Sequence, residues 1–336
     1  MPSTQNYVSE VYEMSTLLSV KDLWVKYKTF EGTVHAVNGV GFEIQEKGTL
    51  GLVGESGAGK TTTALSMMRL IPEPPGIVER GSIHFDGQDL QSISEDEMKK
   101  IRGNQISMIF QDPMTSLNPV LTVGLQISEA IVAHQSLSER EALKKAQEML
   151  EKVQIPSVRH KEYPHEFSGG MRQRVGIAIA LACNPRLIIA DEPTTALDVT
   201  IQAQVIELMR NLREEFSTAM MMITHDLGVV GEVCDRIAVM YAGEIVEEGT
   251  IEQVFERPLH PYTAGLFKCI PDLEEDNSVI HPIRGLMPDP VDLPIGCCFH
   301  PRCPDCIDAC SKKKPARYEK DGHSVLCHHY KGGFAR

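Results

Sequence analysis

Residues 54–61 read Gly54-Glu55-Ser56-Gly57-Ala58-Gly59-Lys60-Thr61, which is the Gly-x-x-x-x-Gly-Lys-[Ser/Thr] pattern of a phosphate-binding loop between a strand and a helix. A strand-like run, 49–53, precedes it and a helix-like run, 61–69, follows it, which is the context that this pattern needs. The glycines let backbone N–H groups turn inward and form, with the helix N-terminus, a cradle for oxyanions. Lys60 can then reach the β- and γ-phosphates, and the Thr61 hydroxyl can ligate Mg²⁺.

Composition limits the classes of function. The chain has 336 residues, and its 33 basic against 46 acidic residues give a net charge of −13, which argues against a nucleic-acid surface. No run approaches the roughly 18 apolar residues of a membrane-spanning helix. The first Lys or Arg is Lys21, and no long apolar core precedes it, so we expect no secretory signal. Nine cysteines then indicate thiols or metal ligands instead of a disulfide framework.

The order of strand-like and helix-like runs predicts an α/β fold. The first third contains mostly strand-like runs, namely 17–25, 36–44, 49–53, 81–85 and 106–110. From 125 to 153 the apolar residues follow a helical period, which predicts a helical insertion. Strands and helices then alternate, with helices at 169–183 and 202–214 and strands at 187–191, 219–224 and 237–241. Beyond about 255 the chain is rich in Pro, His and Cys, and we expect a small appended domain there.

A pair of carboxylates ends the apolar strand 187–191, which has the composition of a strand buried on both faces. Asp191 can hold Mg²⁺, and Glu192 can polarise the water that attacks a γ-phosphate. Taken alone, the pair could also be a solvated strand end. A second glycine-bearing run, Phe167-Ser-Gly-Gly-Met-Arg-Gln-Arg174, opens the helix at 169–183, and alone it could be a simple N-cap turn.

The combination of these motifs resembles the ATP-binding subunits of ABC transporters over residues 16 to 250. The phosphate-binding loop, the Ser168 run, Asp191-Glu192-Pro-Thr-Thr-Ala-Leu-Asp198 and His225-Asp226 follow in the order and at the distances of that family. The resemblance implies a RecA-like P-loop NTPase core at 16–255 with an N-terminal antiparallel β subdomain and a helical subdomain inserted at about 112–166. Residues 1–15 are then a flexible N-terminus, and 256–336 are a small Cys-rich C-terminal extension.

The resemblance also implies roles for individual residues. Gln111 matches the glutamine that senses the metal and the attacking water, and His225 matches the histidine that contacts the γ-phosphate. Asp198 matches a loop that communicates across a dimer, and Tyr27 matches an aromatic that stacks on adenine, although it could simply be an edge-strand tyrosine. The expected catalytic residues are Glu192, His225 and Gln111, and the expected Mg²⁺ ligands are Thr61, Gln111 and Asp191. ATP is expected to bind Tyr27, Gly54, Glu55, Ser56, Gly57, Ala58, Gly59, Lys60, Thr61 and Thr62. The signature residues that cap the ATP of an opposite subunit are expected to be Ser168, Gly169, Gly170 and Gln173.

Two further runs look like the oligopeptide/dipeptide importer branch of the family: Phe110-Gln-Asp-Pro-Met-Thr-Ser-Leu-Asn-Pro119 and Arg257-Pro-Leu-His-Pro-Tyr-Thr263. That branch implies a peripheral subunit at the cytoplasmic face of the membrane. Its partners would be a second homologous ATPase, two transmembrane permease subunits and an extracytoplasmic peptide-binding protein, with no nucleic acid. Nickel, glutathione or oligosaccharide remain alternative cargoes. Rival functions are a soluble ABC ATPase that does not transport, and a metal-binding interaction protein whose nucleotide site regulates assembly.

Four cysteines of the tail, Cys297, Cys303, Cys310 and Cys327, match the pattern of this branch. Four thiolates can hold a [4Fe–4S] cluster or tetrahedral zinc. We favour the iron–sulfur cluster because the spacings lack paired Cys-x-x-Cys knuckles, while zinc and free thiols stay open. Cys306 complicates the pattern by making one such knuckle with Cys303, and Cys298 and His328 are further candidate ligands. The cluster would organise a tail that has too few apolar residues to fold by burial.

Overall fold

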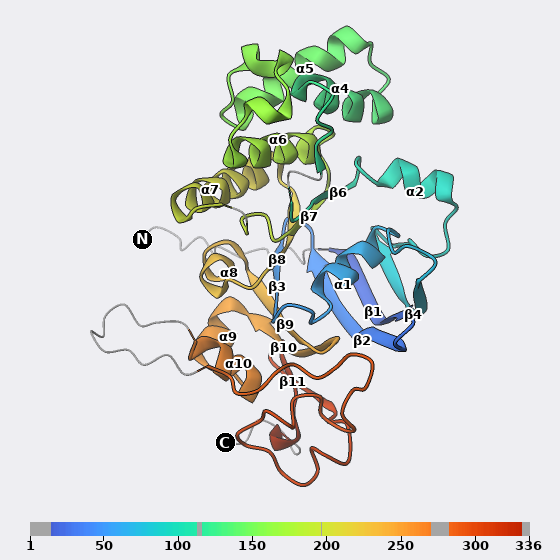
Figure 1. Cartoon of the computed structure of the whole chain (residues 1–336), viewed down its shortest axis with the longest axis vertical. Helices are drawn as coiled ribbons and strands as arrows, with labels where there is room; N and C mark the ends of the chain where they lie inside the picture. The colour runs from blue at the N-terminus through green and yellow to red at the C-terminus, as the bar shows by residue number, and fades with distance from the viewer. Residues whose placement is uncertain (1–14, 113–115, 196, 270–281, 331–336) are drawn as a thin grey trace, which may run out of the picture.

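The computed structural model describes residues 15–112, 116–195, 197–269 and 282–330 (Figure 1). The expectation for residues 1–14 and for parts of the 110–119 motif therefore lies outside the described residues. A central sheet of eight strands has the order β11-β12-β10-β9-β3-β8-β7-β6. Its strands are β3 (Thr49–Val53), β6 (Ile106–Ile109), β7 (Leu187–Asp191), β8 (Ala219–Thr224), β9 (Arg236–Tyr241), β10 (Glu244–Thr250), β11 (Arg317–Lys320) and β12 (His323–Leu326).

The middle of this sheet is parallel, with β6, β7, β8, β3 and β9 running side by side in that order. Every residue of β3, β7 and β8 is buried, as expected for apolar strands covered by other elements on both faces. Val53 pairs with Thr224, and Asp191 pairs with Ile223. The parallel register therefore brings the ends of β3, β7 and β8 to one edge of the sheet.

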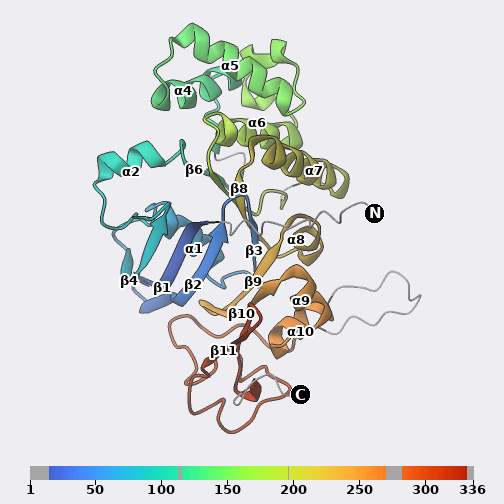
Figure 2. The ribbon, with the colours of Figure 1, turned by 180° about the vertical axis from the view of Figure 1, so that it is seen from behind.

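A second sheet is antiparallel, with the order β2-β1-β4-β5. It consists of β1 (Thr16–Lys28), β2 (Thr33–Gln45), β4 (Gly76–Phe85) and β5 (Gln88–Asp89). Helix α1 (Lys60–Met67) lies beside it (Figure 2), and buried residues of both elements belong to one hydrophobic cluster that also includes residues of β3 and β8. Helix α2 (Glu95–Ile101), which the sequence analysis did not anticipate, begins at a capping box made by Ser94 and Glu97.

The helical insertion is confirmed between β6 and α6 (Gly169–Leu181). It contains α4 (Val123–His134), α5 (Glu139–Lys152), η1 (Ser157–Lys161) and η2 (Pro164–Glu166). The helical period expected over 125–153 is interrupted at 135–138, because Ser138 forms a capping box with Glu141 and so starts a new helix. In Figure 1 the insertion lies at one end of the molecule and the C-terminal strand β11 lies toward the other.

The second half has the expected β-α alternation, which confirms the α/β fold class. The remaining helices are α7 (Val199–Phe216), α8 (Leu227–Val233), α9 (Ile251–Glu256), α10 (Pro261–Phe267) and η3 (His328–Tyr330). Helix α7 begins three residues earlier than expected because the Asp198 side chain accepts a hydrogen bond from the Ile201 N–H, 3.1 Å, and caps it. No helix within the described residues has the length and apolar character that a membrane span requires.

The C-terminal extension adds to the core instead of folding apart from it. Its hairpin, β11 and β12, continues the central sheet by pairing with β10. Glu247 of β10 is 0% exposed, and it accepts hydrogen bonds from the backbone N–H groups of Leu259, 2.7 Å, and His260, 2.8 Å. Its carboxylate also lies 2.8 Å from His323 Nε2 of β12. One buried carboxylate thus ties three segments of the chain together.

We therefore expect Glu247→Ala to lower the free energy of unfolding by about 3 kcal/mol, because it leaves several buried donors without their acceptor. Chemical denaturation measures this loss, with Glu256→Ala as the control on the exposed side of α9. Equal stability of the two variants would contradict the role given to Glu247.

Candidate nucleotide-binding site

The phosphate-binding loop runs from the end of β3 to the start of α1. Gly59 caps α1 in the left-handed region, with φ of 104°, and a side chain there would collide with the Ala36 carbonyl oxygen. A side chain at Gly54 would likewise collide with the Met240 carbonyl oxygen. The glycines are therefore needed for close backbone approach, and the first turn of α1 is left open toward the loop.

Lys60 lies inside this loop and is only 5% exposed. Its Nζ donates to the carbonyl oxygens of Gly54, 2.8 Å, and Glu55, 3.0 Å. Burial lowers the pKa of Lys60, while the nearby carboxylates of Glu192, Asp191 and Glu55 oppose that shift. The loop thus holds a cation where phosphate oxygens are expected to bind.

Asp191, at the end of β7, fits a magnesium site. The residue is 2% exposed, and its Oδ1 has no hydrogen-bond partner within the described residues. Burial raises the pKa of Asp191, whereas a hydrogen bond with the Thr61 side chain acts against that rise. A buried, unpartnered carboxylate oxygen beside a hydroxyl is a donor set that suits Mg²⁺.

Glu192 is positioned by side chains from three separate segments. Its Oε2 accepts hydrogen bonds from Gln111 Nε2, 2.8 Å, and from Thr195 Oγ1, 2.8 Å. His225 Nδ1 lies 3.5 Å from Oε1. Glu192 itself has φ of 45°, a region that non-glycine residues seldom adopt outside special sites. The three predicted catalytic residues therefore do come together, although their roles stay predictions.

Thr195 is a residue that the sequence analysis missed. It lies one turn after Glu192 in the run Pro193-Thr194-Thr195, and this spacing is the signal that could have identified it. Tyr27 contacts α1 through its hydroxyl, which donates to Thr62 Oγ1, 3.4 Å. Its predicted stacking on adenine stays a prediction.

The predicted signature residues lie at the start of α6, which is beside the insertion, whereas α1 is beside the antiparallel sheet (Figure 1). Ser168 caps α6 by accepting a hydrogen bond from the Met171 N–H, 3.4 Å. A side chain at Gly170 would collide with Ile201 of α7, while Gly169 has more room. Gln173 is buried, and its Nε2 has no hydrogen-bond partner in the part of the chain that the structure describes.

The prediction of an iron–sulfur cluster in the tail is wrong. Among the described residues, which include Cys297, Cys303, Cys310 and Cys327, no group of three or more His, Cys, Asp or Glu side chains could hold a metal ion. The same finding leaves the zinc alternative without a site. Burial raises the pKa of Cys297 to about 12 and that of Cys303 to about 11, which favours neutral thiols.

Burial accounts for the order of the tail, contrary to the expectation that it needed a metal. Tyr262 and Phe299 of the extension belong to the main hydrophobic core, and Val325 and Cys327 form a smaller cluster with Leu259. Spacing of cysteines along the sequence did not reveal these contacts, because they depend on where α10 and β12 return to the core.

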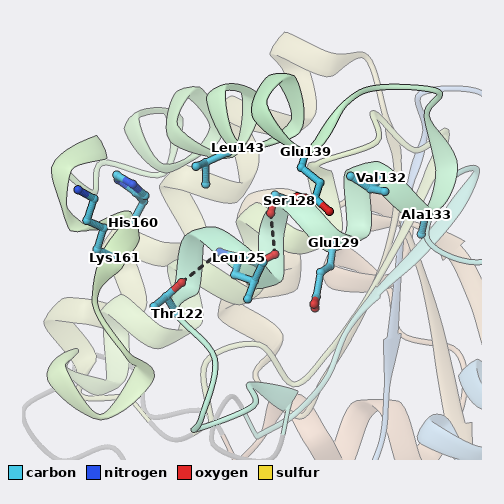
Figure 3. A pocket seen from close by; sticks show the side chains of 10 residues that line it. All are labelled: Thr122, Leu125, Ser128, Glu129, Val132, Ala133, Glu139, Leu143, His160 and Lys161. Atoms are coloured by element: carbon cyan, nitrogen blue, oxygen red, sulfur yellow. Dashed lines mark hydrogen bonds between the residues drawn. The ribbon is translucent and has the colours of Figure 1, made fainter.

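A separate apolar groove lies on the helical insertion (Figure 3). It is a cavity of about 680 Å³ between α4, α5 and η1. Leu125 and Val132 of α4 line it and are each 42% exposed, and Leu143 of α5 faces them. Its polar lining includes Glu129 and Lys161.

Comparisons with known proteins define the class of this site. Residues 37–195 match the model of the family described as ABC transporter, and residues 246–310 match the oligopeptide/dipeptide transporter C-terminal region. The chain therefore belongs to the ABC transporter family, in its oligopeptide/dipeptide branch.

Particular relatives are similar over almost their full length. The oligopeptide transport ATP-binding protein AppD of Bacillus subtilis (strain 168) is 50% identical over 94% of this chain and 98% of its own. The dipeptide transport ATP-binding protein DppD of the same organism is 49% identical over 94% of this chain and 95% of its own. None of the names of the relatives compared mentions an iron–sulfur cluster.

Solved structures support the same class. The dimeric post-hydrolysis structure of the ATP-binding cassette MJ0796 bound to ADP and Pi is 30% identical, with a TM-score of 0.63. The match covers 70% of this chain and 98% of that one. The ATP-binding core is thus shared, and this chain has additional residues beyond it.

We expect Gly59→Ala to weaken ATP binding by at least tenfold. The added side chain distorts the loop, and a distortion on the kcal/mol scale changes a binding constant by roughly this factor. Titration with a fluorescent ATP analogue measures the affinity, and circular dichroism confirms the fold. Gly176→Ala on α6 is the matched control, since a side chain there meets nothing within 4 Å. ATP affinity in Gly59→Ala equal to that of the control would argue against the close approach described above.

Proposed function

We propose that this chain is the ATP-binding and ATP-hydrolysing subunit that powers import of oligopeptides or dipeptides through a membrane ABC transporter. The proposal rests on the position of Glu192, whose carboxylate accepts a hydrogen bond from Gln111 at the edge of the sheet. At this edge the unpartnered oxygen of Asp191 lies close to Lys60 of the phosphate-binding loop. The names of the relatives support the cargo, since they are oligopeptide and dipeptide transport ATP-binding proteins.

In this proposal Glu192 acts as the general base for the attacking water. The hydrogen bonds from Gln111 and Thr195 both reach Oε2, so they orient the carboxylate and leave Oε1 toward His225. His225 then contacts the γ-phosphate, and Tyr27 stacks on adenine. Thr61, Gln111 and Asp191 hold Mg²⁺, which when bound neutralises charge on the phosphates.

The site is proposed to be half of a composite. The segment with Ser168, Gly169, Gly170 and Gln173 closes the ATP site of a second homologous ATPase subunit, and Asp198 lies at the contact between the two. The separation of α6 from α1 in the fold and the dimeric state of the related cassette MJ0796 support this arrangement. Closure uses the binding energy of ATP to favour one conformation of the pair.

The groove on the insertion is proposed to bind one of two transmembrane permease subunits at the cytoplasmic face of the membrane. Its apolar lining and partly exposed leucine and valine favour an amphipathic helix. Because Gln111 lies at the start of the insertion, movement of the groove is linked to Glu192. An extracytoplasmic peptide-binding protein completes the transporter.

Peptide uptake by vesicles that contain the four membrane-associated subunits and the binding protein tests the proposal. Uptake should require ATP and saturate with di- or oligopeptides. Competition of nickel, glutathione or an oligosaccharide with peptide uptake distinguishes the alternative cargoes. ATP turnover that does not change when the permease subunits are added would reject coupling to transport.

We expect Glu192→Gln to retain ATP binding within a few-fold and to lower turnover at least 100-fold, since the amide cannot accept a proton. Phosphate release and ATP titration measure the two properties. Thr195→Ala, which removes one hydrogen bond and keeps the base, should lower turnover by a smaller factor. Undiminished turnover in Glu192→Gln would remove this residue from the proposed catalytic role.

We expect Leu125→Glu and Val132→Glu to abolish co-purification with the permease and to leave ATP binding unchanged, because each puts a charge into the apolar groove. Phe30→Glu is the control, since Phe30 is exposed and lies on the β1–β2 turn, outside the groove. Permease binding by both groove variants at the level of the control would contradict the docking role.

A further inference from the structure

The C-terminal extension reaches the phosphate-binding loop through an arginine. Arg302 Nη1 donates to both carboxylate oxygens of Glu55, at 3.0 and 3.1 Å, although the two residues are 247 positions apart. The Arg302 side chain is 7% exposed and that of Glu55 is 31% exposed. The ion pair is therefore largely shielded from water, where such pairs are stronger than at the surface.

Contacts with the extension and with β9 fix the guanidinium group. Its Nε donates to the Arg284 carbonyl oxygen, 3.0 Å, and its Nη1 lies 3.3 Å from the Tyr241 hydroxyl oxygen. The group also lies over the Tyr241 ring, 5.7 Å from its centre. Tyr241 packs against Tyr262 and Phe299, both of which are buried. These contacts hold the Arg302 guanidinium group in place independently of its ion pair with Glu55.

The backbone of Glu55 lies between the extension and the phosphate-binding lysine. Its N–H donates to the hydroxyl of Tyr262, 3.0 Å, on α10. Its carbonyl oxygen accepts from Lys60 Nζ, 3.0 Å. A shift of Glu55 would therefore move a contact of Lys60 directly.

A third contact comes from the segment that follows Arg284. The Met287 methyl carbon lies 3.1 Å from the position that a side chain on Gly57 would occupy. The Pro290 carbonyl oxygen then accepts a hydrogen bond from the His35 N–H of β2, 2.9 Å. The extension therefore meets the loop at both Glu55 and Gly57.

The charge of Glu55 explains why an arginine is needed. This carboxylate is part of a loop that binds phosphate anions, and it lies close enough to Lys60 to oppose the lowering of its pKa. Unpaired, it would repel the triphosphate and compete for the Lys60 cation. Arg302 neutralises it and fixes the loop through contacts with both carboxylate oxygens.

We propose that Arg302 is a positioning residue for ATP, acting through Glu55, so that the C-terminal extension forms part of the nucleotide site. This inference rests on the proposed function in that the chain binds and hydrolyses ATP. It assigns to the extension a role in binding ATP, separate from any contact with a transport partner.

The test is a double-mutant cycle on the purified full chain, with ATP affinity and ATP turnover measured for each variant. Arg302→Ala should raise the Kd and KM for ATP about tenfold and leave kcat within about twofold. Arg302→Lys should recover part of the affinity, since it keeps the charge and loses the planar geometry of the guanidinium. In the Glu55→Gln background, where no charge needs neutralising, Arg302→Ala should change the Kd by less than about twofold.

Arg317→Ala is the matched control for the extension. Arg317 is an exposed residue of β11, and its side chain donates to Ser324 Oγ, 2.9 Å, and to the Ile245 carbonyl oxygen, 2.8 Å, without contacting the loop. It should loosen the extension and leave the Kd for ATP unchanged. The inference is overturned if Arg302→Ala leaves the Kd unchanged, or weakens ATP binding equally in both backgrounds, or is matched by Arg317→Ala. A wild-type chain that binds no ATP would instead reject the proposed function.

Discussion

The parallel pairing of β3 with β8 and of β8 with β7 fixes the geometry of the nucleotide site. It sets Val53 opposite Thr224 and Asp191 opposite Ile223. The loop after β3, the carboxylates after β7 and the histidine after β8 therefore emerge at the same edge of the sheet. The complete burial of these three strands makes a slip in register costly, since it would move polar residues into the core.

The elements around this edge connect the site to the two ends of the molecule. On one side the hydrogen bond from Gln111 to Glu192 joins the start of the helical insertion to the proposed base. On the other side Arg302 and Tyr262 join the C-terminal extension to Glu55. In the proposed motor, the helical insertion can therefore transmit closure over ATP to a membrane subunit, and the C-terminal extension can stabilise the closed site.

Sequence patterns predicted the parts of the site that are local or that belong to long apolar strands. The phosphate-binding loop, the carboxylate pair and the alternation of strands and helices were all visible, because each depends on residues close together in the chain. The contacts of the extension were not visible, since the Arg302–Glu55 pair joins segments 247 residues apart. Cysteine spacing was misleading for a related reason: it records intervals along the chain, whereas the tail is held by Phe299, Tyr262 and Glu247 against the core.

In the proposed arrangement, the ATP site of this chain is half of a composite whose other half comes from a second ATPase subunit. Sedimentation of this chain with such a subunit, in ATP without Mg²⁺ to prevent hydrolysis, measures whether the two form this composite. We expect a one-to-one complex that forms with ATP, dissociates with ADP and is lost in the Ser168→Arg variant. Full ATP turnover by a chain that sediments as a monomer would contradict it.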